Sequence, residues 1–308
     1  MPVSPIPAAA QSGVEALHAG CVAGVGAEVG ARCADAAYTV QALHGGVGAL
    51  ASAGGVIPAS PSTAGRRLVQ QPRIIVDGGV GWSSFRRPEL TQAPGSRGVP
   101  ERRTLLVGGR LTTVVGIFEG FSPLPTVGGV LAVDGVGTAQ LLRLPSSDGY
   151  SGSVAGWGGG VRVGVVRESF SLPGITLSAM HHRIGSIEYG GEPAAGGARA
   201  TLQPRVTSFR AVVGKDLLAL GVSGGVGWDR HGGRGRIRVG DAGGSYQDLR
   251  LNRRYLFGGV NFTWIVAQAA AELAWGSPTS PFDAAEGTGS YRPGGTELQG
   301  AVTFRVTY

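Results

Sequence analysis

The chain has 308 residues and a formal net charge of +7, and 56 of its residues are glycine. Glycine usually makes up about 7% of a protein, but no Gly-X-Y period runs through this sequence, so a collagen-like fold is excluded. A content of 42% hydrophobic and 15% charged residues also excludes a disordered chain. Lys215 is the only lysine, and the arginines form no run on a helix among aromatic residues, so nucleic-acid binding is not expected.

The first residues, Pro7 to Gln11, contain an A-x-A pattern like the cleavage end of a signal peptide. The basic and apolar regions that precede such a site are missing. Either translation starts further upstream and the pattern marks a signal peptide, or the match is due to chance.

Residues 1–53 are predicted to form a helical N-terminal segment. Ser12 and Glu15 form a capping box, which favours a helix start. The later stretch contains glycines at 45, 46 and 48, which weaken a helix. Apolar residues recur at helical spacing at Val14, Leu17, Cys21 and Val25, and again at Ala36, Val40, Leu43, Val47 and Leu50.

Cys21 and Cys33 are the only cysteines. On one straight helix they would lie roughly 18 Å apart, whereas a disulfide needs Cα atoms within about 7 Å. The glycines between them allow the chain to fold back, so we expect a disulfide between Cys21 and Cys33. The alternative is a pair of buried thiols.

Residues 54–72 are rich in Gly, Pro, Ser, Thr and Ala and are predicted to be a linker. The helical segment before them is expected to be a separate unit, either a plug or a periplasmic cap. Residues 73–308 are predicted to be the main β domain.

From residue 73 onward the apolar residues alternate with polar ones, as they do in β-strands. The pattern predicts ten strands, in which short connections alternate with longer ones. The expected short turns are at 122–125, 172–174, 214–216 and 265–267, and a long arginine-rich loop is expected over 231–251. The predicted strands cover about 73–83, 102–121, 126–145, 152–171, 175–189, 198–213, 218–229, 253–265, 268–276 and 298–308.

The final stretch, from Leu298 to Tyr308, alternates apolar and polar residues and ends in an aromatic residue. It resembles the closing strand of bacterial outer-membrane β-barrel proteins. The resemblance implies an antiparallel up-and-down transmembrane β-barrel in the bacterial outer membrane of a Gram-negative cell. It also implies contact with outer-membrane lipid and with the barrel-insertion machinery, which would read this strand. The alternative is the edge strand of a soluble β-sandwich.

Connections of alternating length are typical of such barrels, which have tight periplasmic turns and longer external loops. No window of eighteen apolar residues predicts a transmembrane helix, and barrel strands do not need one.

Aromatic residues are expected in two belts at the membrane interfaces. The predicted belt at the loop ends of the strands consists of Trp82, Tyr189, Trp228 and Trp275. The predicted belt at the turn ends consists of Phe121, Trp264 and Tyr308.

The fifth and sixth predicted strands fit this pattern poorly. Simple alternation directs His181 and Arg183 toward lipid, at a cost of about 2–4 kcal/mol for an arginine at the midplane. We therefore expect a β-bulge near Met180 that reverses the register. Arg210 raises the same problem.

The interior should carry seven charged residues, and two interpretations of them remain open. In one, the charges pair and fill the bore, since ten strands enclose little more space than side chains fill. In the other, they line a narrow pore that favours anions, because arginine outnumbers acid. The seven predicted residues are Asp77, Arg110, Asp134, Arg162, Arg205, Glu272 and Arg305.

Candidate chemistry is sparse, and no catalytic residue, cofactor or metal is predicted. The G-x-S-x-G pattern at 221–225 lies inside a strand rather than at the strand–helix elbow that hydrolases need. His181 and His182 are adjacent, so they point to opposite faces of a strand and cannot share a metal without a bulge. Asp229-Arg230-His231 resembles one half of the omptin protease site, but no matching acidic pair occurs at the loop ends of the first strands.

A cluster of arginines between Arg230 and Arg254 is predicted to lie on the external side. Its guanidinium groups could contact phosphates of an external glycolipid such as lipopolysaccharide, or they could simply be solvated. The sequence thus predicts an outer-membrane barrel that is structural or forms a narrow solute channel. The alternatives are a membrane-embedded, omptin-like hydrolase and a soluble β-rich binding domain.

Overall fold

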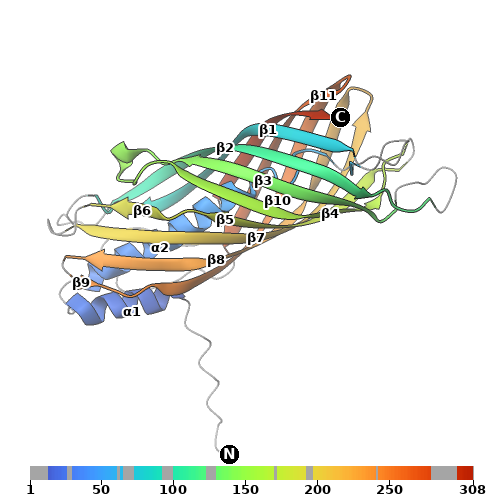
Figure 1. Cartoon of the computed structure of the whole chain (residues 1–308). Helices are drawn as coiled ribbons and strands as arrows, with labels where there is room; N and C mark the ends of the chain where they lie inside the picture. The colour runs from blue at the N-terminus through green and yellow to red at the C-terminus, as the bar shows by residue number, and fades with distance from the viewer. Residues whose placement is uncertain are drawn as a thin grey trace, which may run out of the picture.

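The computed structural model describes residues 13–25, 30–60, 63–64, 73–91, 100–122, 130–169, 172–191, 197–240, 242–278 and 297–307. Two helices precede an antiparallel sheet that closes on itself (Figure 1). The helices are α1 (Gly13–Val25) and α2 (Gly30–Ser52). The strands are β1 (Ile74–Pro88), β2 (Glu101–Phe118), β3 (Ala132–Arg143), β4 (Val154–Val166), β5 (Gly174–Ile184), β6 (Ile187–Gly190), β7 (Ala198–Leu217), β8 (Leu220–Val239), β9 (Ala242–Gly243), β10 (Gln247–Trp264), β11 (Ala267–Pro278) and β12 (Glu297–Thr307).

Pairing of β1 with β12 and of β7 with β8 makes the sheet continuous all the way round. The short β6 continues β5 along β7, and the two-residue β9 pairs with the end of β8. The result is a closed antiparallel barrel of ten strands, which confirms the predicted fold class. A barrel leaves no unpaired sheet edge, because every strand has two neighbours.

Several connections differ from those predicted. The chain turns at 218–219 rather than at 214–216, because Gly214, Lys215 and Asp216 still pair with β8. Strand β2 ends at Phe118 and β3 begins at Ala132, and most of the turn expected at 122–125 lies outside the described residues. Most of the expected arginine-rich loop is strand, since β8 continues to Val239 and β10 begins at Gln247.

The predicted bulge near Met180 is wrong. The pairing of β5 with both neighbours runs without interruption through this residue, and the register shifts lie between Gly116 and Phe118 and between Gly164 and Val166. His181 and Arg183 therefore remain on the outer face, where both are exposed. They avoid the predicted cost because they lie near the loop end of β5, beyond the apolar part of the strand.

We call the end where β1 begins and β12 ends the turn side, and the opposite end the loop side. Toward the turn side the outward residues are apolar. In β8 and in β10 every outward position from 220 to 228 and from 256 to 264 is Leu, Val, Phe, Trp or Gly. Nine residues of a tilted strand rise about 25 Å, which matches the apolar band of a membrane barrel.

Toward the loop side this pattern reverses. In β8 the outward positions 230, 234, 236 and 238 are arginine, while Ile237 and Val239 face inward and are buried. Leu202 of β7 and Leu249 of β10 join them in a hydrophobic core that also contains α1 and α2. The loop-side half thus has an apolar interior and a polar exterior, like a soluble protein, which explains why arginines there are compatible with a strand.

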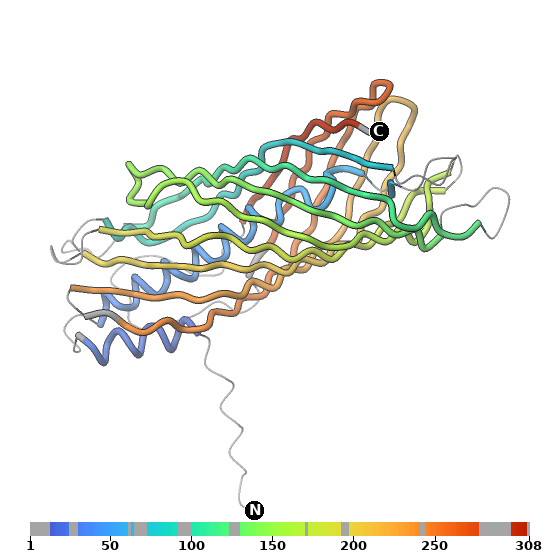
Figure 2. Tube along the Cα trace, in the orientation of Figure 1, coloured from blue at the N-terminus to red at the C-terminus, as the bar shows by residue number. Residues whose placement is uncertain are grey.

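Helix α2 of the N-terminal segment lies inside the barrel. Figure 2 shows the blue trace of α2 running lengthwise between the strands, and α2 contacts β1, β2, β7, β8, β10 and β12. Neither described helix is long and apolar enough to cross a membrane. Helix α1 packs beside α2 at the loop side, against β8, β9 and β10.

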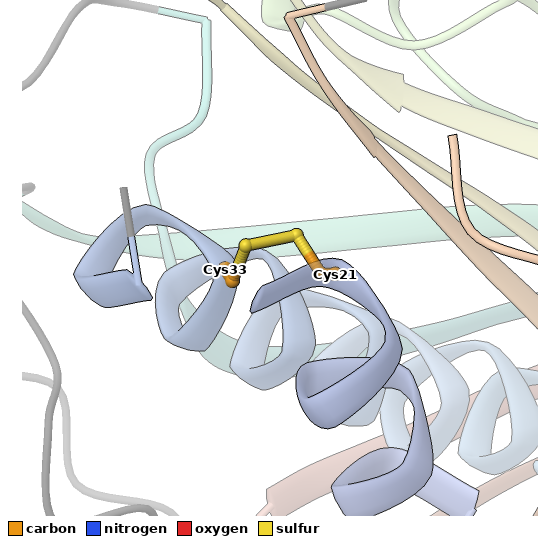
Figure 3. Close-up of a disulfide and its surroundings, with 2 residues drawn as sticks. All are labelled: Cys21 and Cys33. Carbon is orange, nitrogen blue, oxygen red and sulfur yellow. A yellow bond between two sulfur atoms is a disulfide. The ribbon is translucent and has the colours of Figure 1, made fainter. Parts of the chain in front are cut away.

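Cys21 of α1 and Cys33 of α2 form a disulfide with a Cα–Cα distance of 5.7 Å (Figure 3). The chain reverses between the two helices, as the intervening glycines allow. The bridge ties α1 to the loop-side end of α2.

Candidate functional site: the occupied bore

Helix α2 fits the bore because its contacting positions are small. A Cβ added at Gly46 would overlap the ring of Phe85 on β1, and one added at Gly48 would lie 2.5 Å from the ring of His231 on β8. All but one residue of α2 are buried, including Val47 and Leu50. The glycines that weaken the isolated helix are thus the positions where it approaches the wall most closely.

Arg32 and Ser52 mark the two ends of α2 within the barrel. Arg32 donates a hydrogen bond of 3.0 Å to the carbonyl of Leu90, which follows β1 at the loop side. Ser52 donates one of 2.7 Å to the carboxylate of Asp229 on β8. The helix therefore runs from the loop side toward the turn side.

Beyond α2 the chain continues through the turn-side half, where the wall holds its backbone. Arg110 donates to the carbonyl of Ala53, and Arg305 donates to the carbonyl of Pro58 at 2.6 Å. These two arginines were predicted to face the interior, and they do. Residues 53–59 are all buried, so the first part of the predicted linker, 54–59, packs in the interior and is not a free tether.

Three further wall residues hold the same segment. The side-chain amide of Asn261 donates to the carbonyl of Ala59 at 2.8 Å, and the amide of Ala59 lies 3.5 Å from Glu272. The amide of Ala64 donates to Asp134 at 3.0 Å. Buried backbone groups need such partners, and here one neutral amide and two carboxylates of the barrel supply them.

The acidic side chains of the turn-side interior are also paired with arginines. Asp134 accepts from Arg162 at 2.8 Å, and Glu272 accepts from Arg210 at 2.7 Å. Asp77 lies 3.4 Å from Arg305. Burial makes an unpaired charge very costly, so the interior charges neutralise one another around the segment that fills the bore.

Asp229 is the centre of a second buried group. Besides Ser52, its carboxylate lies 3.5 Å from Arg253 and 3.7 Å from His231. His44 of α2 lies beside His231 and contacts the carbonyl of Gly232 at 3.0 Å. The Asp229–His231 pair, which resembles half of the omptin site, is therefore fully buried under α2 and not open at the barrel mouth.

A third group closes the loop side. Glu89 accepts hydrogen bonds of 2.6 Å from the hydroxyls of both Tyr189 and Thr91 and lies 3.2 Å from Arg102. The guanidinium of Arg87 stacks 3.9 Å from the Tyr189 ring centroid. Burial alone would raise the pKa of Glu89, but the hydrogen bonds from Thr91 and Tyr189 outweigh it and lower the pKa to about 2.

Six of the seven residues predicted to face the interior do so, and Arg205 does not. Asp77, Asp134, Arg162, Glu272 and Arg305 are buried within the barrel, and Arg110 is partly buried there. Arg205 is exposed on the outer face, so its predicted position is wrong. The error arises because Arg205 lies in the reversed, loop-side part of β7, where the polar residues face outward.

The predicted belts need one correction. Tyr189 is 1% exposed and points inward, where it binds Glu89. Tyr308 lies outside the described residues. Among the other residues predicted for the belts, Trp82 is partly buried, and Trp228, Trp275, Phe121 and Trp264 are exposed.

Sequence reasoning missed several interior residues. Arg210 follows the buried Val206 and Ser208 at every second position of β7, and this alternation could have placed it inward. Arg87 and Arg253 are completely buried. The partners of Arg253 come from the distant strands β8 and β12, and Arg87 stacks on Tyr189 of β6, so no local pattern separates these two arginines from the exposed ones.

The G-x-S-x-G pattern and the His181–His182 pair both lie within strands. The 221–225 stretch lies within β8, and it forms no elbow. His181 is exposed, whereas His182 points inward and contacts Gln140 at 2.9 Å. Within the described parts of the chain, no cluster of three or more His, Cys, Asp or Glu side chains could hold a metal ion.

No protein-family model and no curated protein matches the sequence. Among solved structures, the translocator domain of the autotransporter NalP from Neisseria meningitidis is similar, with 11% identity, a TM-score of 0.44, and coverage of 77% of this chain and 88% of the other. The outer-membrane protease OmpT from Escherichia coli has 10% identity, a TM-score of 0.41, and coverage of 77% and 97%. The toluene transporter TodX from Pseudomonas putida has 9% identity, a TM-score of 0.31, and coverage of 77% and 89%. Values this low carry no assignment of function, and the barrel is established by its own strand pairing.

Proposed function

We propose that this protein is a bacterial outer-membrane β-barrel with a structural role. It holds its own N-terminal segment inside the bore and so keeps the barrel closed to solutes. The observation that carries the proposal is the occupied interior: α2 fills the loop-side half, and residues 53–59 fill part of the turn-side half with their backbone bound to wall residues.

The outer face supports the membrane location. The outward band of Leu, Val, Phe, Trp and Gly on β8, β10 and β12 would be unfavourable in water, and exposed apolar patches of this extent mark membrane or partner contacts. Val222, Val260 and Val302 in the middle of this band are each about half exposed. A bilayer would cover all of them, and the loop-side half would project from it on the external side.

The N-terminal segment has a consistent path through such a barrel. Helix α1 lies at the loop side, and the chain passes through the bore to the turn side, where β1 begins. With turns on the periplasmic side, as in outer-membrane barrels, α1 is displayed at the external mouth. The C-terminal strand remains the expected contact with the insertion machinery.

A narrow channel is the second candidate, and a specific feature favours it. Arg110, Arg162, Arg210 and Arg305 all face the same turn-side interior. If residues 30–60 left the bore, these side chains would line a pore that attracts anions. In the state described here they are engaged with acids or with the backbone of the segment.

The test has two parts. Membrane fractionation and a gel shift on heating should show that the full-length protein is a barrel in the outer membrane. The purified protein in planar bilayers should then show no steady conductance. A steady, anion-selective current from the unmodified chain would contradict the closed-bore proposal, and recovery of the protein in the soluble fraction would contradict the membrane location.

A further inference from the structure

The outer face carries a hollow where the apolar band meets the loop-side half. It has a volume of about 890 Å³ and is lined by β5, β7, β8, β10 and β11. Its walls include Phe209, Trp228, Leu256 and Trp275, which are all exposed. Phe209 and Trp228 stack with their ring centroids 5.5 Å apart and their planes 18° apart. A volume of this size is within the usual range of about 300–1,000 Å³ for ligand pockets.

Arginines border this hollow on its loop side. Strand register places Phe209, Trp228 and Arg254 in one row across β7, β8 and β10. Arg230 lies one outward position further toward the loop side, and Arg205 lies one position beyond it. All three arginines are exposed. Moving toward the loop side, the surface changes from aliphatic to aromatic and then to cationic.

These positive charges lack acidic partners among the residues that the structure describes. Arg205 lies directly opposite Arg183 in the pairing of β7 with β5, and like charges in that position destabilise a sheet. The two described acids nearest on this face, Glu188 and Asp248, are paired in register with Thr201 and Arg234 rather than with these arginines. An anion bound between the strands would remove the repulsion.

We propose that this surface binds a phosphorylated lipid of the external leaflet, with its acyl chains in the hollow and its phosphates on Arg205, Arg230 and Arg254. Guanidinium groups bind phosphate through paired hydrogen bonds. The arginines extend over roughly 13 Å of strand, from the level of residue 209 to that of 205. This span suits a headgroup that carries more than one phosphate, such as the diphosphorylated, acylated glucosamine disaccharide of lipopolysaccharide. The inference rests on the proposed membrane location.

The test uses the full-length protein in a neutral detergent. Three probes are titrated while tryptophan fluorescence is recorded: the diphosphorylated glucosamine lipid, the same lipid without phosphates, and inorganic phosphate. We expect saturable binding of the first probe. The triple variant R205Q/R230Q/R254Q should bind it roughly 100-fold more weakly, since each arginine contributes about a factor of five. The matched control R143Q, which removes an exposed arginine of β3 far from the hollow, should bind as the unmodified protein does.

Several results would overturn the proposal. The first is that the lipid without phosphates binds as tightly as the diphosphorylated lipid, and the second is that the triple variant binds the diphosphorylated lipid with unchanged affinity. Tight binding of inorganic phosphate alone would also contradict the proposal. So would fluorescence changes that depend only on protein concentration, because they would indicate self-association. Trp275→Ala should weaken the binding of the lipid but leave the preference for phosphate intact. A gel shift on heating is measured for every variant. If the unmodified protein shows no gel shift, the proposed membrane barrel itself is contradicted. If it shows the shift but binds the lipids with and without phosphates equally well, only the lipid site is contradicted.

Discussion

Ser52, the last residue of α2, donates a hydrogen bond of 2.7 Å to Asp229 of β8, and both side chains are buried. This contact joins the N-terminal segment to the barrel wall at the point where the apolar core of the loop side gives way to the charged interior. It also joins residues 177 positions apart in the chain.

Replacing Ser52 by alanine should lower the free energy of unfolding by about 1–3 kcal/mol, because a buried carboxylate loses a hydrogen-bond donor. The measurement is urea unfolding in detergent, followed by the gel shift of the folded barrel. Ser153→Ala, at an exposed loop serine, is the control and should have no effect. Equal stability of both variants would show that the Ser52 contact does not hold α2 in place.

Gly46→Ala should destabilise the protein, because the new Cβ overlaps the Phe85 ring. The double variant G46A/F85A should lose less stability than the sum of the two single losses, since removing the ring makes room for the methyl group. Gly20→Ala is the helical control: its Cβ meets nothing within 4 Å, and alanine favours the helix by about 1 kcal/mol. Strict additivity of the two substitutions would contradict the close approach of α2 to β1.

The loop-side group predicts a dependence of stability on pH. The pKa of Glu89 is lowered from 4.5 to about 2 in the folded protein. Its ionised form therefore stabilises the fold above pH 4.5, and this contribution disappears as the pH falls toward 2. The melting temperature of Glu89→Gln should be lower than that of the unmodified protein at pH 6, and the difference should shrink at pH 3. The control is Glu188→Gln, at an exposed position of β6. A difference that is the same at both pH values would contradict the role of the carboxylate.

Removing the disulfide should release α1 without opening the barrel. A bridge that closes a loop of this length contributes about 3 kcal/mol. Cys21→Ser with Cys33→Ser should make α1 sensitive to protease from the external side, while the gel shift of the barrel persists. Loss of the barrel itself would mean that α1 is needed for assembly, contrary to its position at the edge of the structure.

An arginine in the apolar band should be costly, in contrast to one in the loop-side half. Val222→Arg places the charge against hydrocarbon and should cost about 2–4 kcal/mol when unfolding is measured in vesicles. Glu188→Arg places it on the exposed outer face of β6 and should be tolerated. Similar losses in both variants would contradict the position assigned to the membrane.

The sequence alone determined that the chain forms strands, because alternation is a local property that each strand carries independently. The closed barrel was expected from the resemblance of the last strand to those of outer-membrane barrels, and the pairing of β1 with β12 confirms it. It placed Asp77, Asp134, Arg162 and Arg305 correctly, since their strands alternate cleanly in the apolar band. Only the tertiary structure decided the sides of Arg205 and Tyr189. Beyond the apolar band the polar residues face outward and the apolar ones inward, and nothing local in the sequence marks where that band ends.

The bore is the second feature that the sequence left open. Helix α2 has apolar and small residues on all sides, and that pattern is compatible with a plug as well as with a cap. Its position depends on the fit of Gly46 against Phe85 and on the partner that Asp229 offers to Ser52. These contacts exist only after ten strands have closed around the segment, so the interior was decided by the shape of the barrel and not by any single stretch of the chain.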